Sequence, residues 1–369
     1  MDRKKLTSYI QLINTTGIGP IGFKKLLSRF GDVDKALEAV SLKKKLFPRN
    51  KAEEEIMQAE IKGVEIITSS DEIYPYNLKQ IEDAPPILYA KGRLELLQNC
   101  NMLAVVGSRS ASLSALKMAE TIAGDVSRRG ITIVSGMARG IDAAAHSGAL
   151  KAGGQTIAVL GTGIDVVYPS ENENLYKELS EDGLILTEYP FRTRPQATNF
   201  PRRNRIVSGL SKGVLVIEAG LRSGSLITAH QALEQGRDVY AVPGAPYDGR
   251  SDGCNKLLKD GATLVDGADD IVENFNFSEV TFTPRILEKV SETDDLFEYS
   301  LDKPENNSDS PKQNNEYDKL LSLISSSGED IDELIRTMDL PTEKVLTMIV
   351  ELELDDKITR LPGNRVGKI

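Results

Sequence analysis

The chain has 369 residues, and 45 basic against 55 acidic side chains give it a net charge of −10. Its 40% hydrophobic content excludes a wholly disordered protein, and its length predicts two or three domains. No apolar run reaches the ~18 residues of a membrane span, and no apolar signal-peptide core follows the first residues. Two cysteines and two histidines exclude a disulfide scaffold and a multi-histidine metal centre, so we expect a cytoplasmic protein with no bound metal and no membrane partner.

Residues 1–62 are predicted to form a small helical domain with a net charge of +4 over the first 60 residues. Apolar residues recur at helical spacing before and after Gly17-Ile18-Gly19-Pro20, and Gly31 ends the second helix. This pattern is typical of a helix-hairpin-helix (SAM-like) domain, whose turn presents backbone N–H groups to a phosphate. A plain helical hairpin uses glycine for the same steric reason, so DNA contact through this turn stays open.

Residues 63–280 alternate short β-branched runs with helical segments, which predicts an α/β domain with a doubly wound, mostly parallel sheet. The strands are expected at 64–68, 103–106, 131–135, 156–160, 184–187, 213–217, 238–242 and 262–265. Helices are expected between them, at 115–129, 141–152, 171–179 and 225–235.

The C-terminal part divides into a linker and a small domain. Residues 281–316 are rich in Asp, Glu, Asn and Ser and are predicted to be an acidic flexible linker. Residues 317–369 hold three helical patterns and a hairpin at 358–366, which predicts a winged-helix domain. Its net charge of −4 makes duplex binding improbable and favours a protein contact.

Four glycine- and serine-rich loops follow predicted strands, at 107–112, 136–142, 161–163 and 218–225. Because the carboxyl ends of parallel strands meet at one edge of a sheet, these loops are expected to converge there. Each one alone is compatible with a tight strand-to-helix turn, but together they indicate an anion site. The dinucleotide fingerprint and the Walker A motif are absent, so we expect a phosphodiester backbone and no cofactor. The candidate contacts are Gly107, Ser108, Arg109, Gly136, Arg139, Gly140, Gly161, Ser223, Gly224 and Ser225.

A cationic stretch at 189–217 contains six basic residues and no acid. Within it, Phe200 stands beside Arg202, Arg203, Asn204 and Arg205. Arginines that follow phosphates and an aromatic ring that stacks on a base, worth ~1–3 kcal/mol, hold single strands without sequence preference. A core role for Phe200 and salt bridges for the arginines are the structural alternatives, although the stretch itself offers no acidic partner.

Candidate catalytic groups are few, and the chain is expected not to be an enzyme. His146 lies among small residues of a predicted helix, and His230 lies in another, so both are interpreted as structural. Asp142 and Asp165 follow glycine turns and are interpreted as loop caps. No nucleophile elbow with triad partners is present.

The chain resembles the DNA-processing protein A family (DprA, also called Smf) over residues 70–275. The motifs that carry the resemblance are Gly107-Ser108-Arg109, Ser135-Gly136-Met137-Ala138-Arg139-Gly140-Ile141-Asp142, Gly161-Thr162-Gly163-Ile164-Asp165 with Tyr168-Pro169, Phe200-Pro201-Arg202-Arg203-Asn204-Arg205-Ile206, Arg222-Ser223-Gly224-Ser225-Leu226-Ile227-Thr228, Gly236-Arg237-Asp238-Val239, Val242-Pro243-Gly244 and Ser251-Asp252-Gly253-Cys254-Asn255. The helical N-terminal domain and the winged helix also fit the family's layout.

The resemblance implies an extended Rossmann-like domain that binds single-stranded DNA, forms a homodimer and loads a RecA-type recombinase on incoming strands in natural transformation. The family's DNA pocket corresponds to Gly107, Ser108, Arg109, Arg139, Phe200, Arg203, Asn204 and Arg205. Its dimer and recombinase surface corresponds to Leu233, Asn255, Leu258, Lys259 and Leu264. Where some members carry a lysine before the Phe-Pro pair, this chain has Gln196-Ala197-Thr198-Asn199, and Arg192 or Arg194 would have to replace it.

Two other classes of function are considered. Nucleotide-sugar hydrolases of the lysine-decarboxylase-like Rossmann group share the sheet. Their glycine-rich loop is similar to Pro-Gly-Gly-x-Gly-Thr and is followed by a glutamate. The corresponding loop here, Glu218-Ala219-Gly220-Leu221-Arg222-Ser223-Gly224-Ser225, lacks the Pro-Gly pair. A protein-interaction module is the third class, and the acidic C-terminal domain favours it.

Overall fold

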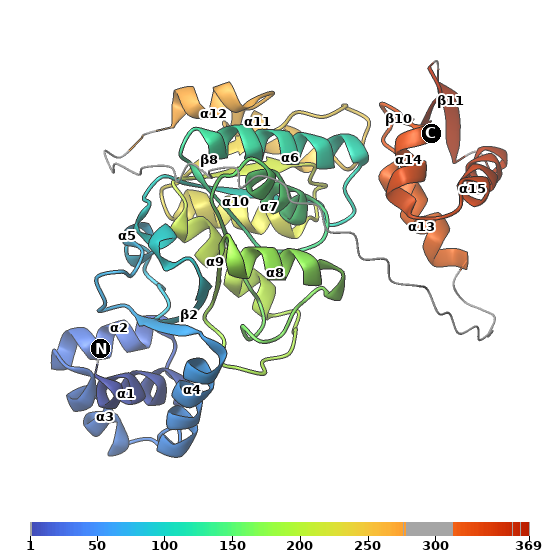
Figure 1. Cartoon of the computed structure of the whole chain (residues 1–369). Helices are drawn as coiled ribbons and strands as arrows, with labels where there is room; N and C mark the ends of the chain where they lie inside the picture. Colours follow the sequence, from blue (N-terminus) through green and yellow to red (C-terminus); the bar gives the residue numbers. More distant parts are fainter. Residues whose placement is uncertain (1, 276, 278–312, 356, 362, 369) are drawn as a thin grey trace, which may run out of the picture. The chain divides into compact units, whose positions relative to one another are not determined.

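The computed structural model describes residues 2–275, 277, 313–355, 357–361 and 363–368 (Figure 1). The described residues belong to two compact units, one within residues 2–277 and one within residues 313–368. The predicted acidic linker falls largely on residues 278–312, which lie outside the described residues. Its last four residues, expected to be flexible, instead begin a helix at Gln313.

The N-terminal region is helical, as the glycine pattern predicted. Gly31 adopts a left-handed conformation (φ 71°) that ends the second helix, and Asp32 accepts a hydrogen bond from Asp34 N to begin the third. Tyr9 and Phe23 form its buried centre. The four helices, in blue in Figure 1, are α1 (Arg3–Asn14), α2 (Pro20–Phe30), α3 (Val33–Ser41) and α4 (Arg49–Lys62).

These helices share one continuous apolar core with the sheet that follows, so side-chain packing continues across the domain boundary expected at residue 62. The core joins Tyr9 and Phe23 to Tyr89 and Ile185 of the sheet. Glu55 of α4 accepts a hydrogen bond from the Tyr89 hydroxyl (3.1 Å) at the same junction.

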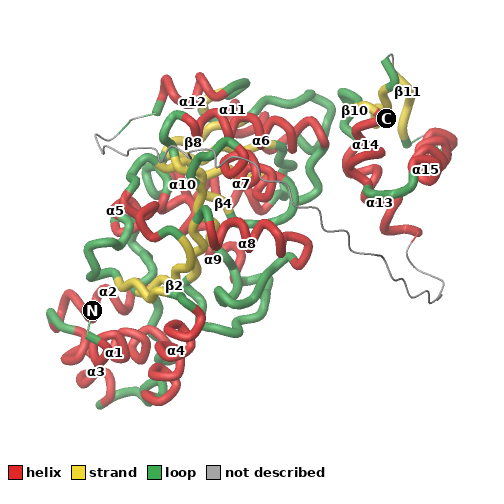
Figure 2. Tube along the Cα trace, in the orientation of Figure 1, coloured by secondary structure: helices red, strands yellow, loops and turns green. Residues whose placement is uncertain are grey.

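The α/β domain is built on a sheet of nine strands among the described residues, in the order β1-β2-β6-β5-β4-β3-β7-β8-β9. Figure 2 draws the strands in yellow among the helices in red. All neighbours from β6 to β9 are parallel, which confirms the doubly wound prediction. The strands are β1 (Glu65–Thr68), β2 (Ile87–Gly92), β3 (Met102–Gly107), β4 (Thr132–Ser135), β5 (Thr156–Val159), β6 (Leu184–Thr187), β7 (Gly213–Ile217), β8 (Asp238–Ala241) and β9 (Thr263–Leu264).

Sequence patterning did not predict β2, which pairs antiparallel with both β1 and β6. Its first four residues are all buried, so it shows no alternation, and it directly follows Pro85-Pro86. Burial on both faces removes the period of two that identifies a half-exposed strand.

Helices cover both faces of the sheet because successive strand residues point to opposite sides. Ala104 and Val214 pack in the core with α9, α10 and α11, whereas Leu103 and Leu215 pack in the core with α6, α7 and α12. The helices are α5 (Tyr76–Lys79), α6 (Leu113–Arg128), α7 (Ile141–Lys151), α8 (Glu173–Glu181), α9 (Asn199–Leu210), α10 (Gly224–Glu234), α11 (Asp252–Lys259) and α12 (Ala268–Asn274), with 3₁₀ turns at Leu94–Gln98 and Ser170–Asn172.

The strand order creates a switch point between β3 and β7. From β3 the chain proceeds outward through β4, β5 and β6, and it then returns to place β7 on the other side of β3. In open α/β sheets, ligands bind outside the carboxyl ends of strands at such a point. The loops that begin at Gly107 and Glu218 border it.

The second unit is a winged helix, as predicted. Its helices are α13 (Gln313–Leu323), α14 (Ile331–Met338) and α15 (Thr342–Leu354), and its strands β10 (Glu329–Asp330), β11 (Ile358–Leu361) and β12 (Arg365–Lys368) pair in the order β10-β12-β11. Gly363 and Asn364 form the hairpin turn with positive φ; Pro362, the first residue of the expected turn, lies outside the described residues. Among the described residues no helix is long and apolar enough to cross a membrane.

The close approach of α6 and α7 gives a test of the fold. A Cβ added at Gly148 would lie 2.2 Å from the carbonyl oxygen of Glu120, so the two backbones must separate in Gly148→Ala. We expect this substitution to lower the free energy of unfolding by about 1–3 kcal/mol, the cost of overpacking, as measured by denaturant titration.

Gly22→Ala is the matched control. It also places a methyl group on a helix, but the nearest atom, Ile18 Cγ2, is 4.0 Å away. We expect stabilisation by roughly 0.5–1 kcal/mol because alanine restricts the unfolded chain and favours helix. Equal effects of the two substitutions would contradict the packing described.

Candidate functional site

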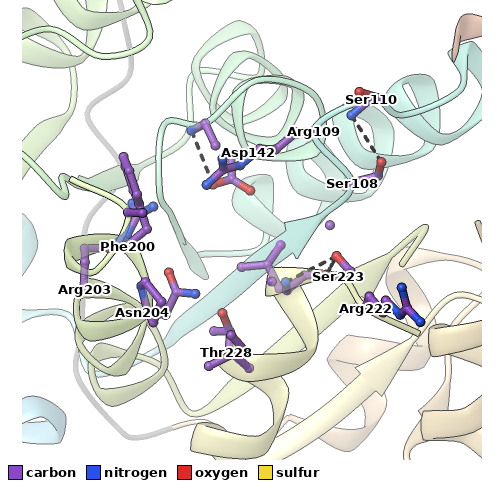
Figure 3. A pocket seen from close by; sticks show the side chains of 18 of the residues that line it. Ser108, Arg109, Ser110, Asp142, Phe200, Arg203, Asn204, Arg222, Ser223 and Thr228 are labelled. Atoms are coloured by element: carbon purple, nitrogen blue, oxygen red, sulfur yellow. Dashed lines mark hydrogen bonds between the residues drawn. The ribbon is translucent and has the colours of Figure 1, made fainter. Parts of the chain in front are cut away.

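The four predicted loops meet at the carboxyl edge of the sheet, around two adjoining cavities. The larger, of about 820 Å³, lies at the switch point and is lined from the loop after β3, the loop after β7 and the first turns of α9. The smaller, of about 240 Å³, extends toward the loops after β4 and β5. Arg109, Phe200 and Arg203 line both. In Figure 3, Phe200, Arg203 and Asn204 lie on one side of the larger cavity and Arg222 and Ser223 on the other.

The structure brings most of the predicted contact residues to these cavities. Those that line one or both are Gly107, Ser108, Arg109, Gly136, Arg139, Gly161, Phe200, Arg203, Asn204, Ser223, Gly224 and Ser225. Gly140, Arg202 and Arg205 line neither. Gly140 has a φ of 74° and packs under the first loop, where a Cβ would lie 2.2 Å from Ser108 O. Arg202 is exposed on α9.

Arg205 is a structural cation, which corrects the expectation that it lacks an acidic partner. Its Nε lies 3.1 Å from Asp83, and its Nη2 lies 2.5 Å from Glu188. Only 10% of its side chain is exposed. Glu188 stands one residue before the cationic stretch and Asp83 comes from a distant part of the chain, so a search of the stretch alone finds neither. The ion pairs fix α9 against β6.

Arg203 forms the floor of the cavities. It is buried, and its Nη1 donates a hydrogen bond to Val159 O. Burial lowers the pKa of Arg203 to about 10, while nearby Asp142 acts in the opposite direction. A Cβ at Gly136 would overlap the guanidinium, so Gly136 is required for steric reasons beneath Arg203.

Asp142 was missed as a lining residue, although its role as a loop cap was predicted. Its carboxylate, labelled in Figure 3, accepts hydrogen bonds from Gly136 N (3.1 Å) and Ala138 N (3.4 Å). Burial raises the pKa of Asp142, and Arg203 and the two backbone N–H groups oppose that rise. The carboxylate therefore organises the loop after β4 from behind.

Phe200 is partly exposed on the wall between the cavities. The Arg109 guanidinium lies over its ring, 5.3 Å from the centroid, and the ring of Tyr168 is 5.5 Å away. Gly161 allows the close approach of Phe200, since a Cβ there would lie 2.9 Å from Cδ1. Tyr168 lines both cavities, yet sequence reasoning gave it no role; the available signal was the Tyr168-Pro169 pair, which belongs to one of the sequence motifs.

The rim of the cavities is cationic. Arg109, Arg139 and Arg222 are all exposed. Arg139 pairs with Glu171, but both side chains are more than half exposed, so water and salt screen this pair. Arg222 belongs to one of the sequence motifs but was not predicted as a contact. Beside it, Ser223 begins α10 by accepting a hydrogen bond from Ser225 N (3.4 Å), and the positive end of the helix dipole adds positive potential.

Neither Arg192 nor Arg194 lines the described cavities, although Pro195 and Ala197 do. Arg192 has a φ of 62°, its N–H donates to Asp165 Oδ1 (2.8 Å), and its guanidinium lies 3.9 Å from Glu54.

The residues of the expected dimer and recombinase surface lie on α10, α11 and β9, near the β9 end of the sheet. Leu233 and Leu264 are 57% and 51% exposed, and Lys259 is exposed. Leu258 is half-buried against the core. Asn255 instead holds a loop, because its side-chain amide exchanges two hydrogen bonds with the Gly244 backbone (3.1 and 3.2 Å).

His146, considered as a catalytic base, is fully buried on α7 and does not itself line either described cavity. The Thr156 hydroxyl donates to Ile133 O, so it accepts from His146 Nδ1 at 2.7 Å. His146 Nε2 has no hydrogen-bond partner among the described residues. Burial, and to a smaller extent the positive charge of nearby Arg203, lower the pKa of His146 to about 3.

This burial predicts a pH dependence of stability. Between pH 6.5 and about 3 the unfolded chain protonates this histidine and the folded chain does not, so the stability it contributes is complete above pH 6.5 and is lost as the pH falls. The steepest loss is about 1.4 kcal/mol per pH unit. We expect His146→Gln to flatten this dependence in denaturant titrations between pH 7.5 and 5. Parallel pH profiles of the two proteins would be inconsistent with a neutral buried imidazole.

Comparison with known proteins gives one consistent result. Residues 65–276 match the family described as DNA recombination-mediator protein A, residues 3–61 a DprA-like N-terminal HHH domain, and residues 304–364 a DprA winged helix domain. The chain is 48% identical over 207 residues to DNA processing protein DprA of Streptococcus pneumoniae, covering 56% of this chain and 73% of that protein. It is 39% identical over 324 residues to protein Smf of Escherichia coli, covering 87% and 82%.

Two solved structures are similar. The X-ray structure of the S. pneumoniae protein superposes with a TM-score of 0.64 and 39% identity, covering 73% of this chain and 99% of that one. A DprA structure from Helicobacter pylori, described as giving insight into a unique single-stranded DNA binding mode, superposes with a TM-score of 0.53 and 29% identity, covering 58% and 97%.

Proposed function

The chain belongs to the DprA family of DNA recombination mediators, and on that premise we propose that it binds single-stranded DNA without sequence preference. The observation that carries the proposal is the cationic double cavity at the β3–β7 switch point, with Phe200 standing in the wall between its two parts. The H. pylori relative supports the choice of ligand, because its structure is described in terms of single-stranded DNA binding.

Each part of the cavity has a role in this proposal. Arg109 and Arg222 provide exposed guanidinium groups for phosphates, which guanidinium forks bind in a bidentate manner. The loop after β3 and the start of α10 add backbone N–H donors. Contacts of this kind recognise the sugar–phosphate backbone and carry no sequence information.

Phe200 supplies the preference for single strands. A base reaches an aromatic ring in a cavity wall only if it is free of its own base pair and stack. Arg203, which lies on α9 like Phe200, joins this helix to Val159 O at the end of β5, and Gly161 leaves room for the Phe200 ring. Duplex DNA, whose bases stay stacked, would contact only the rim.

The proposal is a binding role and not catalysis. Asp142 is the buried carboxylate that lines the larger cavity, and its Oδ2 is already occupied by two backbone N–H groups. In natural transformation, a homodimer would present bound strands in the cytoplasm to a RecA-type recombinase. Exposed Leu233 and Leu264 with Lys259 are proposed as the dimer and recombinase surface, and Asn255 as its internal support.

Substitution of Arg109 by alanine tests the site. We expect affinity for unstructured oligonucleotides of any sequence to fall roughly 10–100-fold, since hydrogen bonds to charged groups contribute about 1.5–3 kcal/mol. The slope of log affinity against log salt should become shallower by about 0.7 for each phosphate that the variant no longer binds. Both quantities are measured by fluorescence anisotropy titrations at several salt concentrations.

Arg194→Ala is the matched control, because Arg194 is also exposed, belongs to the same cationic stretch and does not line the described cavities. We expect it to bind as wild type does. If Arg109→Ala bound with unchanged affinity and slope, or if both variants lost affinity equally, the cavity would not be the DNA site.

A further inference from the structure

Tyr247 is a fully exposed aromatic side chain at the tip of the loop between β8 and α11. The sequence motifs on either side of it, Val242-Pro243-Gly244 and Ser251-Asp252-Gly253, have no role in the site as described above. An exposed ring is common on a mobile surface, but this loop is tied down on both sides.

Hydrogen bonds fix the loop's shape independently of Tyr247. Asn255 holds its start through the Gly244 backbone, as described above. Inside the loop, Asp248 N donates to Ala245 O (3.0 Å) and Ser251 N donates to Asp248 O (2.8 Å). The Asp248 carboxylate accepts from Arg250 Nε (3.1 Å) and Nη2 (3.0 Å), so the acidic charge next to Tyr247 is paired. An aromatic ring on such a loop loses little conformational entropy when it binds.

The loop packs against the rim of the larger cavity. Gly253 N donates to Ala219 O (2.7 Å), and a Cβ at Gly220 would lie 3.0 Å from Gly249 O. Gly220 and Arg222 line the cavity on the side opposite Phe200. Tyr247 is two residues from Gly249, about 7 Å of chain at most. Leu221, between Gly220 and Arg222, is also exposed.

We propose that Tyr247 is a second base-stacking position, at which a strand that leaves the cavity past Arg222 places a further base on the tyrosine ring. This inference rests on the proposed function and extends the path of the strand beyond the cavity. Alternation of a phosphate-binding arginine with an exposed aromatic ring is the arrangement that holds single strands without reading their sequence. Phe200 and Tyr247 would then stack on bases of the strand on opposite sides of Arg222.

The absence of tryptophan from the chain gives a direct test. In Tyr247→Trp the introduced indole is the only one, and stacking of a base on it should quench its fluorescence when oligothymidylate is added. Tyr76→Trp is the matched control: Tyr76 is also exposed, and its helix packs on the carboxyl end of α9, where Gly209 meets Leu78. That end lies away from the cavities, so we expect no quenching there.

Affinity provides the second measurement. We expect Tyr247→Ala to bind long oligothymidylates roughly fivefold more weakly than wild type, and to bind oligonucleotides too short to leave the cavity equally well. An indole that stays unquenched in Tyr247→Trp under saturating DNA, or an equal loss of affinity in Tyr247→Ala at every length, overturns the inference while leaving the cavity as the site. Quenching that follows protein concentration without DNA also overturns it and indicates a contact between copies. Failure of wild type to bind oligothymidylate overturns the proposed function, and this inference with it.

Discussion

The site depends on parallel pairing of β3 with β7 while the helices that follow them leave toward opposite faces of the sheet. After β3 the chain enters α6 in one core, and after β7 it enters α10 in the other. The two loops diverge from adjacent strand ends, and the space between them is the larger cavity. Gly107 pairs with Ile217 at the end of the β3–β7 ladder, and it permits the close pairing from which the loops diverge, because a Cβ there would lie 2.0 Å from Ile217 O.

Around this opening, arginines of similar appearance in the sequence have different physical roles. Arg109 is exposed over the Phe200 ring, Arg203 is buried as a floor, and Arg205 is neutralised by Glu188 and Asp83. Arg203 and Arg205 both lie on α9, and their positions around this helix explain part of the difference. Arg203 faces the loop after β4, whereas Arg205 faces the end of β6. A high density of basic residues in a sequence therefore indicates where anions are attracted. The position of each residue around the helix decides which side chain can contact them.

The sequence alone was enough for most of the architecture and for the convergence of the loops. Strand ends, glycine turns and helix starts are local features, and parallel topology brings them to one edge. What it could not provide depends on contacts between distant residues. The partnership of Arg205 with Asp83 and the bond of Asn255 to Gly244 need the folded chain. The β2 strand was not predicted because it is buried on both faces. The role of Tyr168 was not predicted because a tyrosine beside a proline indicates no function until the folded chain places Phe200 next to it.

The acidic total of the chain is compatible with a cationic site because the two act over different distances. At physiological ionic strength, charges on the surface are screened within about 8 Å. The net charge of −10 thus repels a polyanion only weakly once the polyanion is more than this distance from the acidic side chains. On the proposed function, a phosphate that enters the cavity would meet Arg109 and Arg222 within contact distance, much closer than this screening length. On the proposed function, the cationic rim would attract a phosphate backbone of either kind, and the position of Phe200 in the cavity wall would select a strand thin enough to enter over a duplex that must remain at the mouth.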